Sequence, residues 1–437
     1  MTMQVPTPRA GDAKAISLYK GRSNIIDLLD TARRPNPLDV VRKDIADAMN
    51  SKNLTFLFGS GCSSARAEDG SELGIPTMGP MAASFLDETD ARFKVPSEDR
   101  ETLKDVLGVD LNDSKFSWNL ESLMEVLYGL RFVLADSKRT ELADAASAVD
   151  RLIKIVKNYV YTVCFEGQSA DPARTVLTTY ERFYRRLAQR DRALPRPWVF
   201  TTNYDLFNET AMDRLGIPYI NGFQGSVERR FNPASFRYTI AEQLDISSRK
   251  WSSLDSLVYF AKLHGSMNWQ STDEGLFPVL EAPLSKEVDP DRMLIYPTPA
   301  KQNASFAAPY SDMFRELQSR VAREQSVLIT LGYSFGDEHV NNIIFQALTI
   351  PTFRLVIFAD PRASQTVQEL RELDDPRVWI VGTEEKSANW KGHYFKSFVD
   401  DVMPSSGEDP TDLAIERVLK KFLHDTPLSD TAGSENE

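Results

Sequence analysis

The sequence predicts an α/β fold with a doubly wound, mostly parallel sheet and a large helical insertion. Short apolar runs of strand length alternate with segments whose apolar residues recur at helical spacing. The run at 54–58 ends in Gly59, and a glycine-rich turn and a helix follow it, which is typical of a βα unit. With 437 residues, 42% of them hydrophobic, the chain can bury a sizeable core.

We expect one α/β domain over residues 37–405, with an N-terminal arm at 1–36 and a C-terminal helix and acidic tail at 406–437. The arm is polar and punctuated by prolines, so we predict a loosely structured segment with a short amphipathic piece at 25–29. Residues 38–49 show helical spacing. The tail after Thr426 is small, polar and acidic, a composition typical of disorder.

From about 100 to 195 nearly all of the apolar spacing is helical, which predicts the insertion. Apolar runs of strand length then return between helical segments. They lie at 198–200, 257–263, 293–296, 326–330, 355–358 and 378–381. This alternation favours a mostly parallel sheet.

Charge and cysteine content narrow the function classes. A formal net charge of -12 argues against broad electrostatic binding of nucleic acid by this chain alone. Two cysteines, Cys62 and Cys164, suit a reducing compartment and cannot form a four-cysteine zinc site. No signal-like or membrane-spanning apolar stretch occurs, so we expect a cytoplasmic protein.

Polar side chains follow two of the predicted strands. Asn203 and Asp205 come after the run at 198–200, and His264 ends the run at 257–263. Because ligands of open α/β sheets bind outside the carboxyl ends of the strands, these side chains can converge on one substrate. The alternatives are a turn residue for Asn203, a helix cap for Asp205 and a core histidine for His264.

Two glycine-containing turns follow other predicted strands. Residues 59–64 could hold a phosphate at a helix N-terminus, or could form a tight turn without a ligand. They are not a P-loop, because the Gly-Lys-Ser/Thr ending is absent. In the turn at 331–339 we expect Asp337 to cap a helix. Glu338 and His339 resemble half a metal site without a second ligand pair, so no metal is predicted.

Six arginines gather in a short stretch, which is dense for an acidic protein: Arg182, Arg185, Arg186, Arg190, Arg192 and Arg196. Such runs usually form solvated helix faces with ion pairs. The alternative is a surface for an acidic partner or a phosphate backbone.

Taken together, these segments resemble a sirtuin-like NAD-binding domain, of the bacterial branch found in anti-phage defence systems. Residues 59–63 stand where sirtuins carry Gly-Ala-Gly-x-Ser, and 74–76 match the Gly-Ile-Pro that follows. Residues 201–205 correspond to Thr-Gln-Asn-x-Asp, 264–265 to His-Gly, and 332–334 to Gly-Thr-Ser. The resemblance spans about 50–385 and implies a Rossmann-like sheet interrupted by the helical insert.

The sequence also departs from the sirtuin pattern. Residues 77–79, Thr-Met-Gly, replace the Asp-Phe-Arg that follows Ile-Pro in sirtuins, and Thr202 replaces glutamine. The four-cysteine zinc module that helps sirtuins to bind acyl-lysine peptides is missing. This departure weighs against deacylation.

The resemblance implies an NAD hydrolase that releases nicotinamide and ADP-ribose, with NAD as substrate and no metal. Asn203 would position the water and the ribose, and His264 would accept a proton. The implied binding residues are Gly59, Gly61, Cys62 and Ser63 around the pyrophosphate, Asp205 at the ribose pocket, Ser334 near the adenosine and Asp360 near the adenine ribose.

Two other functions stay open: an NAD- or ADP-ribose-binding scaffold subunit, and an NAD-dependent deacylase. The resemblance further implies NAD depletion in abortive infection, a homo-oligomer, and a partner protein that gates the activity. We expect a HerA-like hexameric ATPase ahead of a short Argonaute, since the chain shows no second effector domain after about residue 405.

Overall fold

The computed structural model describes residues 16–29, 36–67, 71–135, 142–170, 173–245, 250–272, 278–285, 292–294, 309–384 and 390–404. The predicted C-terminal helix and acidic tail lie outside these residues, as does much of the predicted arm.

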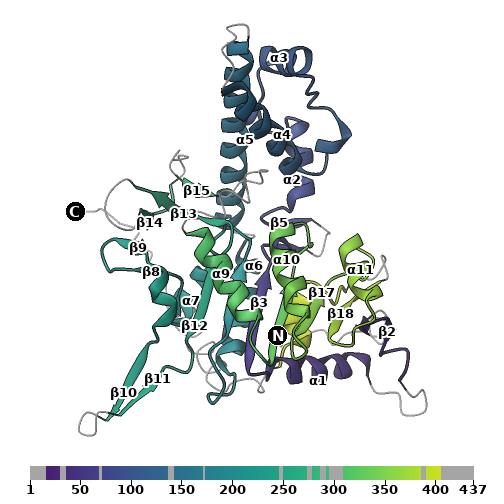
Figure 1. The fold of residues 1–437 in the computed structure, drawn as a ribbon, viewed down its shortest axis with the longest axis vertical. Helices are drawn as coiled ribbons and strands as arrows, with labels where there is room; N and C mark the ends of the chain where they lie inside the picture. Colours follow the sequence, from purple (N-terminus) through teal and green to yellow (C-terminus); the bar gives the residue numbers. More distant parts are fainter. Residues whose placement is uncertain are drawn as a thin grey trace, which may run out of the picture.

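A nine-stranded sheet forms the centre of the fold (Figure 1), in the order β2-β1-β18-β17-β16-β3-β6-β12-β7. Its strands are β1 (Ile16–Lys20), β2 (Ser23–Asn24), β3 (Asn53–Phe58), β6 (Trp198–Thr201), β7 (Tyr219–Ile220), β12 (Val258–Lys262), β16 (Ser326–Leu331), β17 (Arg354–Phe358) and β18 (Val378–Thr383). From β18 to β7 every pairing is parallel. Within this parallel part the chain begins at β3 in the middle, runs outward on one side through β6, β7 and β12, and then returns to β16 on the other side, so the strand order reverses between β3 and β16. This confirms the predicted doubly wound sheet.

The register brings the ends of the central strands level. Phe58 of β3 pairs with Leu331 of β16 on one side and with Thr201 of β6 on the other. Lys262 of β12 pairs in turn with Thr201. Everything that follows these four strands therefore emerges at one edge of the sheet.

Helices cover both faces of the sheet. Successive residues of a strand point to opposite faces, and apolar residues on both faces are buried under these helices. Phe56 and Phe58 pack in one buried cluster, and Leu57 between them packs in the other. The first cluster includes residues of α1 (Pro37–Met49), α6 (Ala173–Ala188), α7 (Phe207–Leu215) and α12 (Phe395–Ser397). The second includes α9 (Tyr310–Val321), α10 (Glu338–Leu348) and α11 (Gln365–Glu372).

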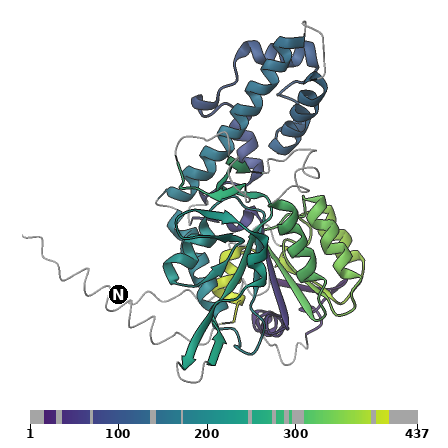
Figure 2. The ribbon, with the colours of Figure 1, turned by 60° about the vertical axis from the view of Figure 1, so that its left-hand side comes forward.

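The predicted helical insertion rises from the sheet as an upper lobe (Figures 1 and 2). The lobe contains α2 (Met78–Leu86), α3 (Ser97–Leu107), α4 (Leu120–Ala135) and the long α5 (Ala143–Ser169). The next helix, α6, returns to the sheet, where Phe183 meets Phe56 edge to face with ring centroids 5.1 Å apart. The helical stretch predicted at about 100–195 thus covers α3, α4 and α5 of the lobe and one helix of the sheet layer, whereas α2 of the lobe precedes it.

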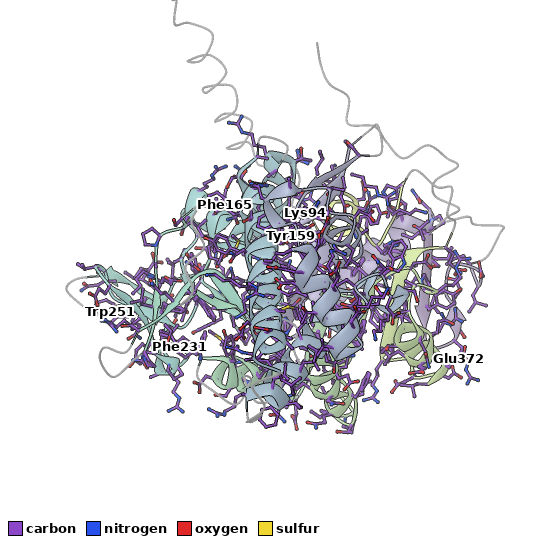
Figure 3. The ribbon with its side chains drawn as sticks, turned by 90° about the horizontal axis from the view of Figure 1, so that it is seen from above. Lys94, Tyr159, Phe165, Phe231, Trp251 and Glu372 are labelled. Atoms are coloured by element: carbon purple, nitrogen blue, oxygen red, sulfur yellow. The ribbon has the colours of Figure 1, made fainter. Side chains whose placement is uncertain are left out.

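A smaller five-stranded sheet and a hairpin flank the central sheet (Figure 1). The smaller sheet contains β8 (Phe223–Gln224), β9 (Arg229–Phe231), β13 (Gly265–Ser271), β14 (Val279–Glu281) and β15 (Arg292–Leu294), and the hairpin is β10 (Ala241–Asp245) with β11 (Lys250–Ser253). Seen from above, Trp251 of the hairpin lies at one side of the molecule, Glu372 of α11 at the opposite side, and Tyr159 of α5 between them (Figure 3).

Residues 16–24, which we expected in a loosely structured arm, instead extend the central sheet. Strand β1 pairs antiparallel with β18, and β2 pairs with β1. Ile16 and Leu18 alternate into the core, and the Ser17 hydroxyl donates to the Gly382 carbonyl oxygen. The prolines that suggested an irregular arm lie outside this short strand.

Candidate functional site

Two glycine turns meet where the strand order reverses. A Cβ atom on Gly59 would lie 2.4 Å from the Gly332 carbonyl oxygen, and one on Gly61 would lie 2.9 Å from Gly332 Cα. Gly332 itself has a φ of +61°, and a Cβ atom there would lie 2.6 Å from the Cys62 nitrogen. Only glycine permits this approach at all three positions, so the turn after β3 and the turn after β16 are packed backbone to backbone.

The first turn uses its amides within the protein. Gly59 donates to the Leu331 carbonyl at 2.9 Å and Gly61 to that of Gly332 at 3.0 Å. Cys62 and Ser63 donate to the carbonyls of Gly59 and Ser60, both at 3.0 Å. The tight-turn interpretation therefore has direct support, and a phosphate could bind these four amides only by sharing or displacing these bonds. Contact with a pyrophosphate stays a prediction.

The Cys62 side chain points into the core. Its thiol is buried and donates to the Leu331 carbonyl oxygen at 3.1 Å. Burial raises the pKa of the Cys62 thiol well above its ordinary value, and the nearby Asp205 carboxylate adds to that shift. The thiol stays protonated, so Cys62 has no nucleophilic role here.

A buried hydrogen-bond chain joins the first turn to the residues after β6. The side-chain amide of Asn203 donates to the Gly59 carbonyl at 2.9 Å and to the Ser63 hydroxyl oxygen at 2.8 Å. The Ser63 hydroxyl donates to Asp205 Oδ2 at 2.5 Å. Both Nδ2 hydrogens of Asn203 are thereby used. Its Oδ1 has no hydrogen-bond partner among the residues that the structure describes, so this acceptor remains for a ligand.

Asp205 holds the backbone at the start of α7, although Leu206 is the N-cap of that helix, and it also belongs to this hydrogen-bond chain. Its Oδ1 accepts from the Phe207 amide at 3.1 Å in the first turn of α7, while Oδ2 accepts from Ser63. The residue is only 2% exposed. Both carboxylate oxygens of Asp205 are thus used within the protein, and a contact of Asp205 with a ribose stays a prediction.

Lys262, which the sequence alone did not single out, holds the loop that follows β6 through hydrogen bonds to its backbone. Its ammonium donates to the carbonyl oxygens of Tyr204 and Asp205 and, at 2.8 Å, to the Ser266 hydroxyl. It also lies 2.8 Å from Glu209 Oε1 of α7. Lys262 is 1% exposed, and the signal for it was a lysine inside an otherwise apolar strand run.

Glu209 is buried beside Lys262, and its pKa is raised. Burial raises its pKa from 4.5 to about 7, although the nearby Lys262 ammonium acts in the opposite direction. Its second carboxylate oxygen, Oε2, lacks a hydrogen-bond partner within the described residues. The cost of leaving that oxygen charged and unpaired favours the protonated form.

His264 lies in the turn between β12 and β13 and is 8% exposed. Its Nε2 is 2.8 Å from Asp337 Oδ2, at the N-terminus of α10. The N–H direction is not aligned for a hydrogen bond, so in the described part of the chain Nε2 has a close carboxylate but no hydrogen-bond partner. The ring also packs near Phe314 of α9, with centroids 6.4 Å apart. Asp337 caps α10 as expected, since Oδ1 accepts from Val340 N at 3.0 Å.

Ser334 and Asp360 lie at the same edge of the sheet. Ser334 is exposed after β16, and Asp360 is half-buried after β17, where its Oδ1 accepts from the Arg362 amide at 2.9 Å. No hydrogen bond links either residue to Asn203 or His264 within the described segments. Their placement is compatible with an extended ligand lying across the strand ends, and their contacts with adenosine stay predictions.

The arginine cluster is mostly used to hold the fold together. Arg182 pairs with Asp400 at 3.0 Å, and Arg192 and Arg196 both pair with Asp255. Arg190 donates to the carbonyl oxygens of Met49, Ser51 and Pro195. The contacts of Arg182, Arg192 and Arg196 support the ion-paired interpretation for these three, whereas Arg190 bonds to backbone carbonyl oxygens.

Two kinds of feature are absent from the described residues. They contain no group of three or more His, Cys, Asp and Glu side chains that could hold a metal ion. They also contain no helix with both the length and the apolar character that crossing a membrane requires.

Comparison with known proteins gives one family match, which covers part of the chain. Residues 197–377 match the family described as the SIR2-like domain. The matched segment contains Asn203, His264, Ser334 and Asp337, while the first βα unit precedes it. The match covers less than half of the chain and supports a sirtuin-like relationship; SIR2-like domains bind NAD. No curated protein matches the chain.

Replacing Gly332 should test the backbone contact between the two turns. Gly108 is a matched control, because its φ of +70° is also left-handed but nothing lies within 4 Å of its Cβ position. We expect Gly108→Ala to lower the free energy of unfolding by about 1 kcal/mol, and Gly332→Ala by about 2–4 kcal/mol because a steric clash is added. Denaturant unfolding measures both. Equal losses would show that the contact adjusts without cost.

The raised pKa of Glu209 predicts a pH dependence of stability. Between pH 4.5 and about 7 the folded state binds this proton more tightly than the unfolded state, so the stabilisation is present below pH 4.5 and is lost as the pH rises through 7. Relative to Glu209→Gln, which cannot titrate, the wild-type free energy of unfolding should fall by up to about 3 kcal/mol across this window. Parallel unfolding curves for the two proteins from pH 4.5 to 7.5 would contradict the assignment.

Proposed function

We propose that the protein is an NAD hydrolase that cleaves the bond between nicotinamide and ribose, giving nicotinamide and ADP-ribose. One observation carries the proposal: Asn203 and His264 leave the carboxyl ends of neighbouring parallel strands, beside the point where the strand order reverses. That point is where open α/β sheets bind nucleotides. Both residues also lie within the segment that matches the SIR2-like domain.

The proposed reaction does not need a general acid for its leaving group. Nicotinamide leaves as a neutral pyridine from a cationic one, so no proton must be delivered to the leaving nitrogen. The ribose develops oxocarbenium character, and water adds to its C1 carbon while losing one proton. The protein must therefore hold the ribose and the water, stabilise positive charge, and accept that proton.

Asn203 suits the positioning task because its amide cannot rotate freely. Gly59 and Ser63 hold both of its Nδ2 hydrogens, which fixes the direction of Oδ1. From this position Oδ1 would accept a hydrogen bond from the attacking water or from a ribose hydroxyl. A preorganised acceptor of this kind has no reorientation cost when the reaction starts.

His264 suits the proton-accepting task. A neutral imidazole can accept a proton from the water or from a ribose hydroxyl. In our proposal Asp205 supports the ribose pocket through Ser63, while Ser334 and Asp360 lie toward the adenosine. Gly59, Gly61, Cys62 and Ser63 form the wall beside the pyrophosphate.

Turnover of NAD by point variants tests this assignment. We expect Asn203→Ala and His264→Ala to lower the rate of nicotinamide release roughly 100-fold or more. His264→Ala has a matched control in His424→Ala, which removes a histidine outside the SIR2-like segment and should leave the rate unchanged. Melting temperatures within a few degrees of wild type would show that the variants fold. Equal turnover by wild type and both variants would refute the proposed roles, and NAD binding without turnover would favour a scaffold function.

We further propose that the activity depletes cytoplasmic NAD during anti-phage defence and is gated by assembly. A hydrolase without control would empty the cell of NAD. The supporting observation is that large apolar side chains are exposed on the helical lobe and on the β10–β11 hairpin: Trp118, Phe132, Leu244 and Trp251. Exposed apolar patches often mark interaction surfaces. A homo-oligomer with a HerA-like hexameric ATPase partner, ahead of a short Argonaute, is the assembly that we propose.

Measurements of molar mass test the assembly. By light scattering we expect a homo-oligomer for the purified chain and a larger complex with the ATPase. Replacing Trp118 and Phe132 with serine should lower the molar mass, because both side chains are more than 70% exposed and contribute little to the fold. A wild-type protein that stays monomeric with and without the ATPase would contradict the proposal.

A further inference from the structure

We propose that Asp337 is a positioning residue for His264: its carboxylate orients the imidazole and keeps the proton on Nε2. The inference deepens the proposed function, on which its catalytic meaning rests. Its geometric basis is the separation of 2.8 Å between His264 Nε2 and Asp337 Oδ2. The two residues come from separate elements, the turn after β12 and the N-terminus of α10.

The carboxylate is held rigidly by its own helix. Oδ1 accepts from the Val340 amide at 3.0 Å, which leaves Oδ2 directed toward His264. The preceding loop is fixed as well, because the Tyr333 hydroxyl donates to the Asn341 side-chain oxygen at 2.9 Å and the Asn341 amide donates to the Phe335 carbonyl at 2.8 Å. Asp337 is 9% exposed. A carboxylate fixed in this way can hold an imidazole in one orientation.

The two ring nitrogens then have different roles. Nε2 is buried against the carboxylate, and although its N–H is poorly aligned, a rotation of the imidazole toward the fixed carboxylate would complete the hydrogen bond. Such alignment commonly tightens when a substrate binds. A carboxylate beside one nitrogen stabilises the tautomer that carries hydrogen there, so the lone pair of Nδ1 becomes the proton acceptor.

Three variants separate this role from helix capping. Asp337→Asn and Asp337→Ser both introduce a residue that caps helices well, but neither new side chain presents a carboxylate to His264. Ser364→Ala is the matched control, because Ser364 caps α11 by accepting from Val367 N and has no hydrogen bond to Asn203, His264 or Asp337 in the described part of the chain. All four proteins are then compared at the same pH.

The first measurement is nitrogen NMR of the protein labelled with 15N-histidine, with His264→Gln assigning the His264 signals among four histidines. We expect a neutral Nε2–H tautomer in wild type and in Ser364→Ala, and a mixed or Nδ1–H tautomer in Asp337→Asn and Asp337→Ser. A wild-type Nδ1–H tautomer, or one that the Asp337 variants leave unchanged, would overturn the proposal whether or not NAD is cleaved.

The second measurement is NAD turnover by the same proteins. We expect kcat to fall roughly 10- to 100-fold in both Asp337 variants, with KM for NAD within about 3-fold of wild type, because positioning affects the reaction step more than binding. Ser364→Ala should keep the wild-type kcat. An unchanged kcat in both Asp337 variants would overturn the proposal. A wild type that does not turn over NAD would contradict the proposed function instead, and the NMR result would then decide on Asp337.

Discussion

The close backbone contact between Gly59, Gly61 and Gly332 is the constraint on which the site depends. It joins the turns after β3 and β16, the two strands between which the sheet order reverses. A side chain at any of the three positions would push these turns apart. The Gly59 carbonyl oxygen and the Ser63 hydroxyl oxygen accept hydrogen bonds from the side-chain amide of Asn203. The position of Asn203 therefore depends on the same contact.

Buried polar groups connect the glycine turns to the loop that carries Asn203. Asn203, Ser63 and Asp205 are nearly inaccessible to water, and Lys262 and Glu209 are buried beneath them. Buried polar atoms without partners are costly, so a nearly complete hydrogen-bond network favours one arrangement over its alternatives. Removing the Lys262 ammonium would take away one of the donors to this loop, the one that bonds the carbonyl oxygens of Tyr204 and Asp205. The loop that carries Asn203 is thus fixed from both sides.

The sequence predicted much of this arrangement, and what it missed is non-local. Periodicity and turn residues were enough to place Asn203 and His264 at strand ends and Asp337 at a helix start, because those signals come from neighbouring residues. The proximity of His264 to Asp337 joins distant segments and left no local pattern. The same reason explains residues 16–24, whose pairing with β18 depends on an edge far along the chain. The glycine turn was ambiguous because a phosphate site and a tight packing contact require the same residue type.

The chemical character of the site favours one class of reaction. Asn203 is held through its donors and presents an acceptor, and in our proposal His264, beside the Asp337 carboxylate, presents a second one. An O-glycoside needs an acid to protonate its leaving oxygen, and a pair of acceptors does not provide one. In a cationic N-glycoside the leaving group departs as a neutral base without such an acid. The reaction then needs only a nucleophile that gives up a proton. The pyridinium riboside of NAD meets that requirement, and acceptor atoms directed at its ribose also favour the positive charge that develops as the bond breaks.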